Sequence, residues 1–180
     1  MLGFIFATHN EFDTFRLNVT DAEERKLLGG QIIGNGKIKG KDICYAYCGC
    51  GKVNASSAAS LLIERYNPHS ILNVGLAGSV GLPTGTYFVS ESVQGDVDLK
   101  FLKDPKVFDG SDFLKPAVMG IQKVWPDMPS ARLVTTDKFI TSEAEDIKKR
   151  YGNCLVDMEG AAINWVCEQF NKNYYGIKIV

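Results

Sequence analysis

Short apolar segments alternate with segments of helical periodicity along most of the chain, and this alternation limits the folds that it can adopt. Apolar runs bounded by turn residues predict strands over residues 2–7, 31–38, 42–48, 70–75, 86–93, 131–136 and 174–180. Helical spacing predicts helices over residues 53–66, 113–124, 142–150 and 159–170. Helices between strands cover the faces of a sheet, so the pattern predicts a three-layer α/β fold with a mixed central sheet.

The segment 53–66 illustrates the helical pattern. Ala55 and Ala59 recur at helical spacing, and Pro68 ends the helix because the residue before a proline disfavours helical backbone. No internal repeat or long linker separates the elements along the sequence. We therefore expect a single domain over residues 1–180.

Composition and charge exclude several classes of partner. The 180 residues carry a net charge of −1 without basic clusters, which argues against nucleic acid as a partner. No apolar run is long enough to span a bilayer, so we expect no membrane partner. Residues 1–7 lack a basic leader, which favours a buried strand over a signal peptide. Five cysteines, an odd number without a secretion signal, predict reduced thiols and a cytoplasmic location.

Cys48 and Cys50 lie close enough in the sequence to suggest a metal site. His9 and His69 are the only histidines, neither is close to this pair in the sequence, and no second cysteine pair has the spacing of metal ligands. Buried packing of small cysteine side chains explains the pair better. We therefore expect no metal.

Polar and glycine-rich segments follow several predicted strands. They read ATHNEFD (7–13), GCGKVNA (49–55), GLAGSVG (75–81), TTDKFI (135–140) and VDMEG (156–160). In α/β folds ligands bind where loops leave the carboxyl ends of strands, so these segments form the candidate site. Each taken alone has an ordinary structural explanation: a tight turn, an acid at a helix start, or a core phenylalanine. GLAGSVG is also not the G-x-G-x-x-G of dinucleotide sites, and no Walker lysine follows it.

Taken in order, the segments carry a more specific signal. GCGKVNA before a helix, NVGLAG (73–78), TTDKFI and VDMEGAA (156–162) match the motifs of one enzyme family in order and spacing. The chain resembles the methylthioadenosine/S-adenosylhomocysteine nucleosidases, which belong to the wider nucleoside phosphorylase family. The resemblance runs from residue 2 to the end of the chain, and VDMEGAA is its most specific part. It implies a nucleoside phosphorylase-like fold, a small-molecule nucleoside substrate and no cofactor.

The resemblance also implies a reaction, in which an N-ribosidic bond is hydrolysed through an oxocarbenium-like transition state. Glu11 matches the glutamate that positions and deprotonates the attacking water. Glu159 matches the glutamate that binds the ribose 2′- and 3′-hydroxyls, a role that suits an acceptor-only group whose charge favours a cationic sugar. Met158 is expected to line the ribose, whereas Asp157 is expected to be structural.

The same resemblance implies which residues surround the base and the 5′-substituent. Phe139 is expected to stack on the purine, with Ile140 supplying backbone hydrogen bonds. Thr8 and Cys50 fall where the family commonly has larger apolar residues near the ribose and the thioalkyl group, so we expect a 5′-substituent pocket of different shape. The residues expected to close around the base are Gly75, Ala77 and Gly78.

The end of the chain departs from the family pattern. The family carries its general acid in a Ser-Asp pair just beyond a last strand resembling GIKIV, and a C-terminal helix follows. This chain stops at Val180, before that position. We therefore expect either a longer gene product or a form that is weak or inactive, because losing a general acid costs about 10²–10⁴-fold in rate. Leu76 and Thr136 are further departures within the pocket motifs.

Two alternative functions stay open at this point. In the phosphorylases, the segment after the first strand resembles G-D-P-x-R, and its arginine binds phosphate. Here residues 7–16 read ATHNEFDTFR, so Arg16 is present without the Gly-Asp-Pro. Water needs a base whereas phosphate needs a cationic clamp, so Glu11 favours hydrolysis. The second alternative is a non-catalytic nucleoside-binding protein.

By analogy with the family we expect a homodimer, with residues 93–105 facing the partner.

Overall fold

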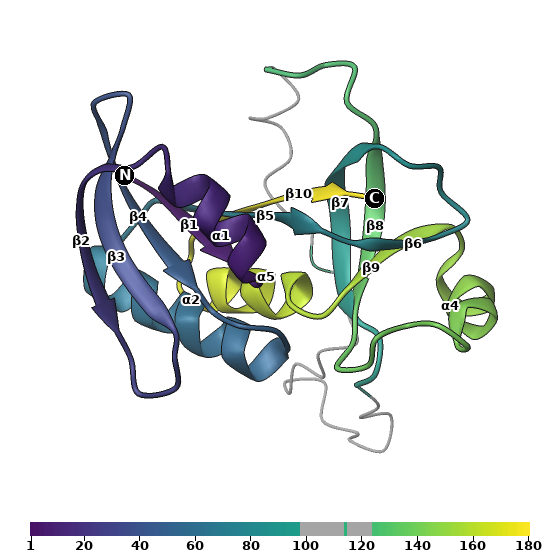
Figure 1. The fold of residues 1–180 in the computed structure, drawn as a ribbon. Helices are drawn as coiled ribbons and strands as arrows, with labels where there is room; N and C mark the ends of the chain where they lie inside the picture. The colour runs from purple at the N-terminus through teal and green to yellow at the C-terminus, as the bar shows by residue number, and fades with distance from the viewer. Residues whose placement is uncertain (98–113, 115–123) are drawn as a thin grey trace.

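The computed structural model describes residues 1–97, 114 and 124–180. These residues form one ten-stranded sheet in the order β2-β3-β4-β1-β5-β10-β7-β8-β9-β6 (Figure 1). The strands are β1 Leu2–Phe6, β2 Thr20–Lys26, β3 Ile32–Ile38, β4 Lys41–Tyr47, β5 Ser70–Leu76, β6 Gly78–Val80, β7 Thr86–Gln94, β8 Ser130–Thr135, β9 Cys154–Asp157 and β10 Asn173–Ile179. The helices among the described residues are α1 His9–Arg16, α2 Lys52–Tyr66, α4 Ala144–Tyr151 and α5 Gly160–Gln169.

All seven predicted strands are present, with ends shifted by a few residues. The structure adds β2, β6, β9 and α1, which the apolar pattern did not predict. The helices predicted over 53–66, 142–150 and 159–170 are confirmed as α2, α4 and α5. The helix predicted over 113–124 lies outside the described residues except at its two ends, where Leu114 forms an antiparallel bridge with Ser92.

The sheet is mixed, as predicted. Strands β4, β1, β5 and β10 are parallel to one another, and β7, β8 and β9 form a second parallel set. The two sets meet through antiparallel pairing of β10 with β7. Strands β2 and β3 extend one edge by antiparallel pairing, and β6 closes the other edge against β9.

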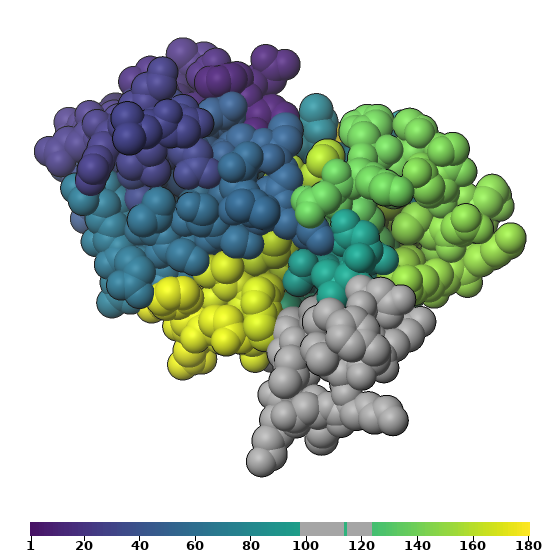
Figure 2. Space-filling model, turned by 90° about the horizontal axis from the view of Figure 1, so that it is seen from below, coloured from purple at the N-terminus to yellow at the C-terminus, as the bar shows by residue number. Residues whose placement is uncertain are grey.

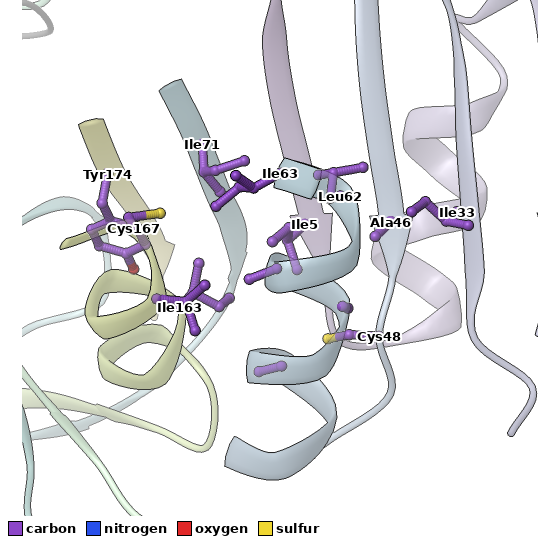
Figure 3. Close-up of a cluster of buried hydrophobic side chains, with 14 of the residues drawn as sticks. Ile5, Ile33, Ala46, Cys48, Leu62, Ile63, Ile71, Ile163, Cys167 and Tyr174 are labelled. Atoms are coloured by element: carbon purple, nitrogen blue, oxygen red, sulfur yellow. The ribbon is translucent and has the colours of Figure 1, made fainter. Parts of the chain in front are cut away.

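Side chains of the central strands alternate between two apolar layers. On β1, Phe6 packs with Phe12 of α1 on one face, whereas Ile5 packs against α2 and α5 on the other. Figure 3 shows this second layer, in which Leu62 of α2 and Ile163 of α5 lie over the sheet and are fully buried. Helices therefore cover both faces, which confirms the expected layered α/β arrangement.

Helix α2 starts and ends at residues with unusual backbone angles. Gly51 precedes it with φ of 98°, a conformation that glycine adopts without strain, and no side chain caps this end. Asn67 follows it in the left-handed conformation with φ of 47°, immediately before Pro68. The amino end of α2 consequently keeps free backbone N–H groups that other segments can bind. Each helix that the structure describes is too short or too polar to span a bilayer.

Candidate active site

Glu11 is positioned by the start of helix α1. Thr8 is the N-cap residue, and its hydroxyl accepts a hydrogen bond from the Glu11 N–H. The Glu11 carboxylate returns the interaction, because Oε2 accepts from the backbone N–H of Thr8 at 3.0 Å and of Ala7 at 3.2 Å. This reciprocal capping box holds the carboxylate against the end of β1.

A third backbone donor reaches Glu11 from a neighbouring strand. The N–H of Leu76, at the end of β5, lies 2.8 Å from Glu11 Oε1. Gly75 makes this approach possible, since a Cβ built there would lie 2.6 Å from the same oxygen. The structure thus places Gly75, predicted to lie near the purine, directly against Glu11, the predicted catalytic base.

Glu159 stands at the junction between β9 and α5, where it is the N-cap residue and only 7% exposed. Its Oε1 accepts a hydrogen bond from the Gly51 N–H at 2.8 Å, and its Oε2 accepts from the Met158 N–H at 3.3 Å. Burial raises the pKa of the Glu159 carboxyl above its ordinary value, and the nearby charge of Asp157 raises it further. The hydrogen bond from Gly51 acts in the opposite direction.

The two acids converge on the segment around Cys50. The Cys50 thiol lies 4.0 Å from the carbonyl oxygen of Ala7, whose N–H binds Glu11, and the next residue, Gly51, binds Glu159. Burial raises the pKa of the Cys50 thiol, and the charges of Glu159 and Glu11 both raise it further. Cys50 therefore interacts electrostatically with both carboxylates, while its side chain is exposed.

Asp157 has a structural environment, as expected. Its Oδ2 lies 2.8 Å from Lys178 Nζ and accepts the Gly160 N–H at 2.9 Å. Its Oδ1 accepts the Thr135 hydroxyl, which in turn accepts the Ala161 N–H. These bonds attach the end of β9 and the first turn of α5 to β8 and β10.

The residues predicted around the base occupy different environments. Phe139 is 81% exposed, whereas Ile140 packs against the apolar cluster beneath α4. Gly78 belongs to β6, where a Cβ would lie 2.8 Å from a methyl carbon of Val156, so this glycine is needed for packing. Ala77 packs against a second cluster and donates its N–H to the carbonyl of Ile179. Their contact with a base remains a prediction.

Sequence reasoning missed a group of charged residues next to the segment that binds Glu159. The Lys52 ammonium lies 2.5 Å from Asp96 Oδ1 and 3.5 Å from Asp137 Oδ2. Asp137 Oδ1 also accepts the Lys52 N–H at 3.0 Å, and Asp96 Oδ2 accepts the Asp137 N–H at 2.8 Å. Lys178 was missed too, although a single lysine inside the apolar run GIKIV is a detectable signal of a buried ion pair.

No arrangement suited to a metal is found in the described part of the chain, where no group of three or more histidine, cysteine, aspartate or glutamate side chains gathers. The donors around Glu11 and Glu159 are backbone N–H groups. Such donors suit carboxylates that in turn face a hydroxyl-bearing ligand or water. The geometry therefore fits acid–base chemistry on a polar substrate.

Comparison with known proteins agrees with this fold. Residues 2–180 match the Phosphorylase superfamily, so the chain belongs to this family. It is 30% identical, over 95% of its length and 81% of the relative's, to the 5′-methylthioadenosine/S-adenosylhomocysteine nucleosidase of Staphylococcus haemolyticus. The nucleosidase of the same name from Shewanella loihica is 29% identical over 98% of this chain and 84% of its own. The predicted family resemblance is thereby confirmed.

Solved structures give the same result. A 5′-methylthioadenosine/S-adenosylhomocysteine nucleosidase from Colwellia psychrerythraea, in complex with adenine, superposes with a TM-score of 0.83 at 26% identity and covers 99% of this chain and 82% of its own. A futalosine hydrolase mutant of Helicobacter pylori has a TM-score of 0.85 at 23% identity, over 99% of this chain and 88% of its own, and shows the shared fold.

Proposed function

We propose that the chain is a nucleosidase, which hydrolyses the N-ribosidic bond of a nucleoside resembling 5′-methylthioadenosine or S-adenosylhomocysteine. The relatives are nucleosidases of this type, and they favour hydrolysis over both alternatives considered from the sequence. The observation that carries the proposal is the convergence of Glu11 and Glu159, held by backbone donors, on the segment around Cys50.

In this proposal Glu11 is the catalytic base. Its carboxylate takes a proton from a water molecule while the water oxygen forms a bond to the anomeric carbon of the ribose. The bond between that carbon and the purine nitrogen breaks, its electron pair leaves with the purine, and the purine takes up a proton from solvent water, to which Glu11 afterwards releases its own. Three backbone N–H groups keep the Glu11 carboxylate in one orientation for this step.

Glu159 is proposed to bind the ribose hydroxyls. An ionised carboxylate accepts both hydroxyl hydrogens, and a buried negative charge stabilises the oxocarbenium-like sugar more strongly than an exposed one. Met158 would lie along the ribose. Phe139 would stack on the purine, with Thr8 and Cys50 beside the 5′-substituent.

The position of Arg16 argues against the phosphorylase alternative. Its guanidinium Nε lies 2.6 Å from Glu24 Oε1, so this arginine, in the last turn of α1, is already paired with a carboxylate of β2. The charge of Glu24 also raises the pKa of Arg16, through the hydrogen bond first and the ion pair second. A phosphate clamp needs an arginine that faces the substrate.

By analogy with the family, we also propose that the protein is a cytoplasmic homodimer. The segment expected to face the partner, 93–105, lies mostly outside the described residues. Light scattering after size-exclusion chromatography tests the dimer: a mass near twice 19.8 kDa is expected, and a monomer at all concentrations contradicts it.

Adenine release from 5′-methylthioadenosine, followed with and without phosphate, tests the function. We expect release that does not depend on phosphate, and a loss of about 10²–10⁴-fold in rate for Glu11→Gln. Glu159→Gln should also lose activity, whereas the exposed acid variant Glu64→Gln is the matched control and should not. Formation of 5-methylthioribose 1-phosphate, or nucleoside binding without adenine release, would overturn the proposal.

A further inference from the structure

Three loops meet at Lys52, next to the proposed ribose site. Lys52 follows Gly51 at the start of α2, Asp96 follows β7, and Asp137 follows β8. Figure 2 shows the corresponding segments, blue, teal and green, adjoining on one face of the molecule. The Lys52 side chain is 13% exposed, so this cation is largely withdrawn from water.

The four contacts among these residues close a ring. Lys52 reaches Asp137 twice, through its backbone N–H to Oδ1 and through its ammonium to Oδ2. Asp96 joins them, since one of its oxygens accepts from the Lys52 ammonium and the other from the Asp137 N–H. Burial raises the pKa of Asp96, but the hydrogen bonds from Asp137 and Lys52 outweigh it and leave this pKa below its ordinary value.

The ring is directly joined to the ribose-binding acid. The amino end of α2 has no side-chain cap, and its first two free N–H groups bind carboxylates from two other loops. The Gly51 N–H binds Glu159, and the Lys52 N–H binds Asp137. Partial positive charge at a helix start favours both carboxylates there. Without the Lys52 ammonium, Asp96 and Asp137 would both lose the cation that their carboxylates share.

We propose that Lys52 is a positioning residue for the reaction. Its contacts connect the start of α2, with the Gly51 N–H, to the loops after β7 and β8. These contacts keep Glu159 and Phe139, which lies in the loop after β8, in fixed positions relative to each other. The inference rests on the proposed function, since it gives a role to residues around that same site. Lys52 itself contacts neither the water nor the sugar in this proposal. It acts by keeping one backbone donor fixed on the Glu159 carboxylate.

The first test is kinetic. We expect Lys52→Met to raise KM for 5′-methylthioadenosine about 10-fold or more, with a smaller fall in kcat, because substrate binding through Glu159 and the Phe139 loop is weakened while Glu11 is untouched. Lys52→Arg should restore most of the loss, since arginine can pair with both carboxylates. The matched control is Lys37→Met, which breaks an exposed ion pair with Asp21 at 2.9 Å and should leave KM unchanged.

The second test needs no activity. In an NMR titration, the Gly51 amide should shift as Glu159 ionises, and Lys52→Met should reduce the amplitude of this shift at least 2-fold. Asp96→Asn, which keeps the cation and removes one partner charge, is the second variant should Lys52→Met fail to fold, and it should reduce the amplitude as well. Unchanged KM in an active protein, or an unchanged Gly51 titration, overturns the role of Lys52. Absence of adenine release by the unaltered chain overturns only the proposed function, and the titration then decides the inference alone.

Discussion

Lys178 and Asp157 form an ion pair inside the protein, with Nζ 2.8 Å from Oδ2 and each side chain only 2% exposed. Lys178 belongs to β10, and Asp157 is the last residue of β9, two residues before Glu159. Removing a charge from water costs several kcal/mol, which only a close partner and further hydrogen bonds offset. Asp157 has both, because Gly160 and Thr135 donate to its oxygens. The pair therefore fixes the start of α5, from which Glu159 projects.

Lys178→Met should be strongly destabilising. It leaves the Asp157 carboxylate buried without its cation, and breaking a buried pair in this way costs about 3–5 kcal/mol. Urea unfolding measures the change. Replacing both partners, as Lys178→Met with Asp157→Leu, should recover much of the loss because no lone charge is then buried. A loss below about 1 kcal/mol in the single variant contradicts the structural role of the pair.

Glu159→Gln should change how stability depends on pH. The folded state raises the pKa of Glu159 through burial and through the charge of Asp157. Between the pKa of Glu159 in the unfolded chain and its higher pKa in the folded protein, the folded protein binds a proton more readily than the unfolded chain. The contribution of Glu159 to stability is therefore fully present below the unfolded pKa and is lost as pH rises through the folded pKa. Glutamine does not titrate, so the free energy of unfolding of Glu159→Gln, measured in urea, should rise relative to the unaltered protein between pH 4 and pH 8. A difference between the two that is independent of pH would contradict this linkage.

The sequence predicted the elements that carry long apolar patterns and missed those that are polar or very short. Strand β2 reads TDAEERK and is exposed throughout, so hydrophobic periodicity gives no signal, and pairing with β3 alone defines it. Strands β6 and β9 have only three and four residues, and they pair with each other although they are far apart in the sequence. Short strands of this kind depend on tertiary partners that local sequence does not specify.

The candidate site shows the same division. Glu11 and Glu159 were predicted from motifs, and in the structure backbone donors hold each of them near the segment around Cys50. Lys52 and Asp137 are 85 positions apart, and nothing local in the sequence pairs them. Ion pairs between distant loops depend on how the sheet brings those loops together. A sequence motif identifies the residues of one loop but not the partners of that loop in space.

Phe139→Ala should weaken substrate binding without a large change in stability. The side chain is 81% exposed, so its removal leaves no cavity in the core. Stacking of a base on an aromatic ring contributes about 1–3 kcal/mol, so KM should rise about 10-fold while the melting temperature stays within a few degrees. Leu17→Ala, at the C-cap position of α1 and 88% exposed, is the control and should change neither quantity. An unaltered KM in Phe139→Ala would exclude stacking on this ring.

Gly75→Ala should lower the rate by displacing Glu11, the proposed catalytic base. The new methyl group would lie 2.6 Å from Glu11 Oε1 and 3.0 Å from its carboxyl carbon, so the carboxylate must move and its bond from the Leu76 N–H must lengthen. A misplacement on the order of 1 Å can cost about 100-fold in rate, and we expect kcat for adenine release to fall by about that factor. Gly29→Ala is the matched control, because a Cβ at that position meets nothing within 4 Å. Equal rates for the two variants would show that the close approach of β5 does not orient Glu11.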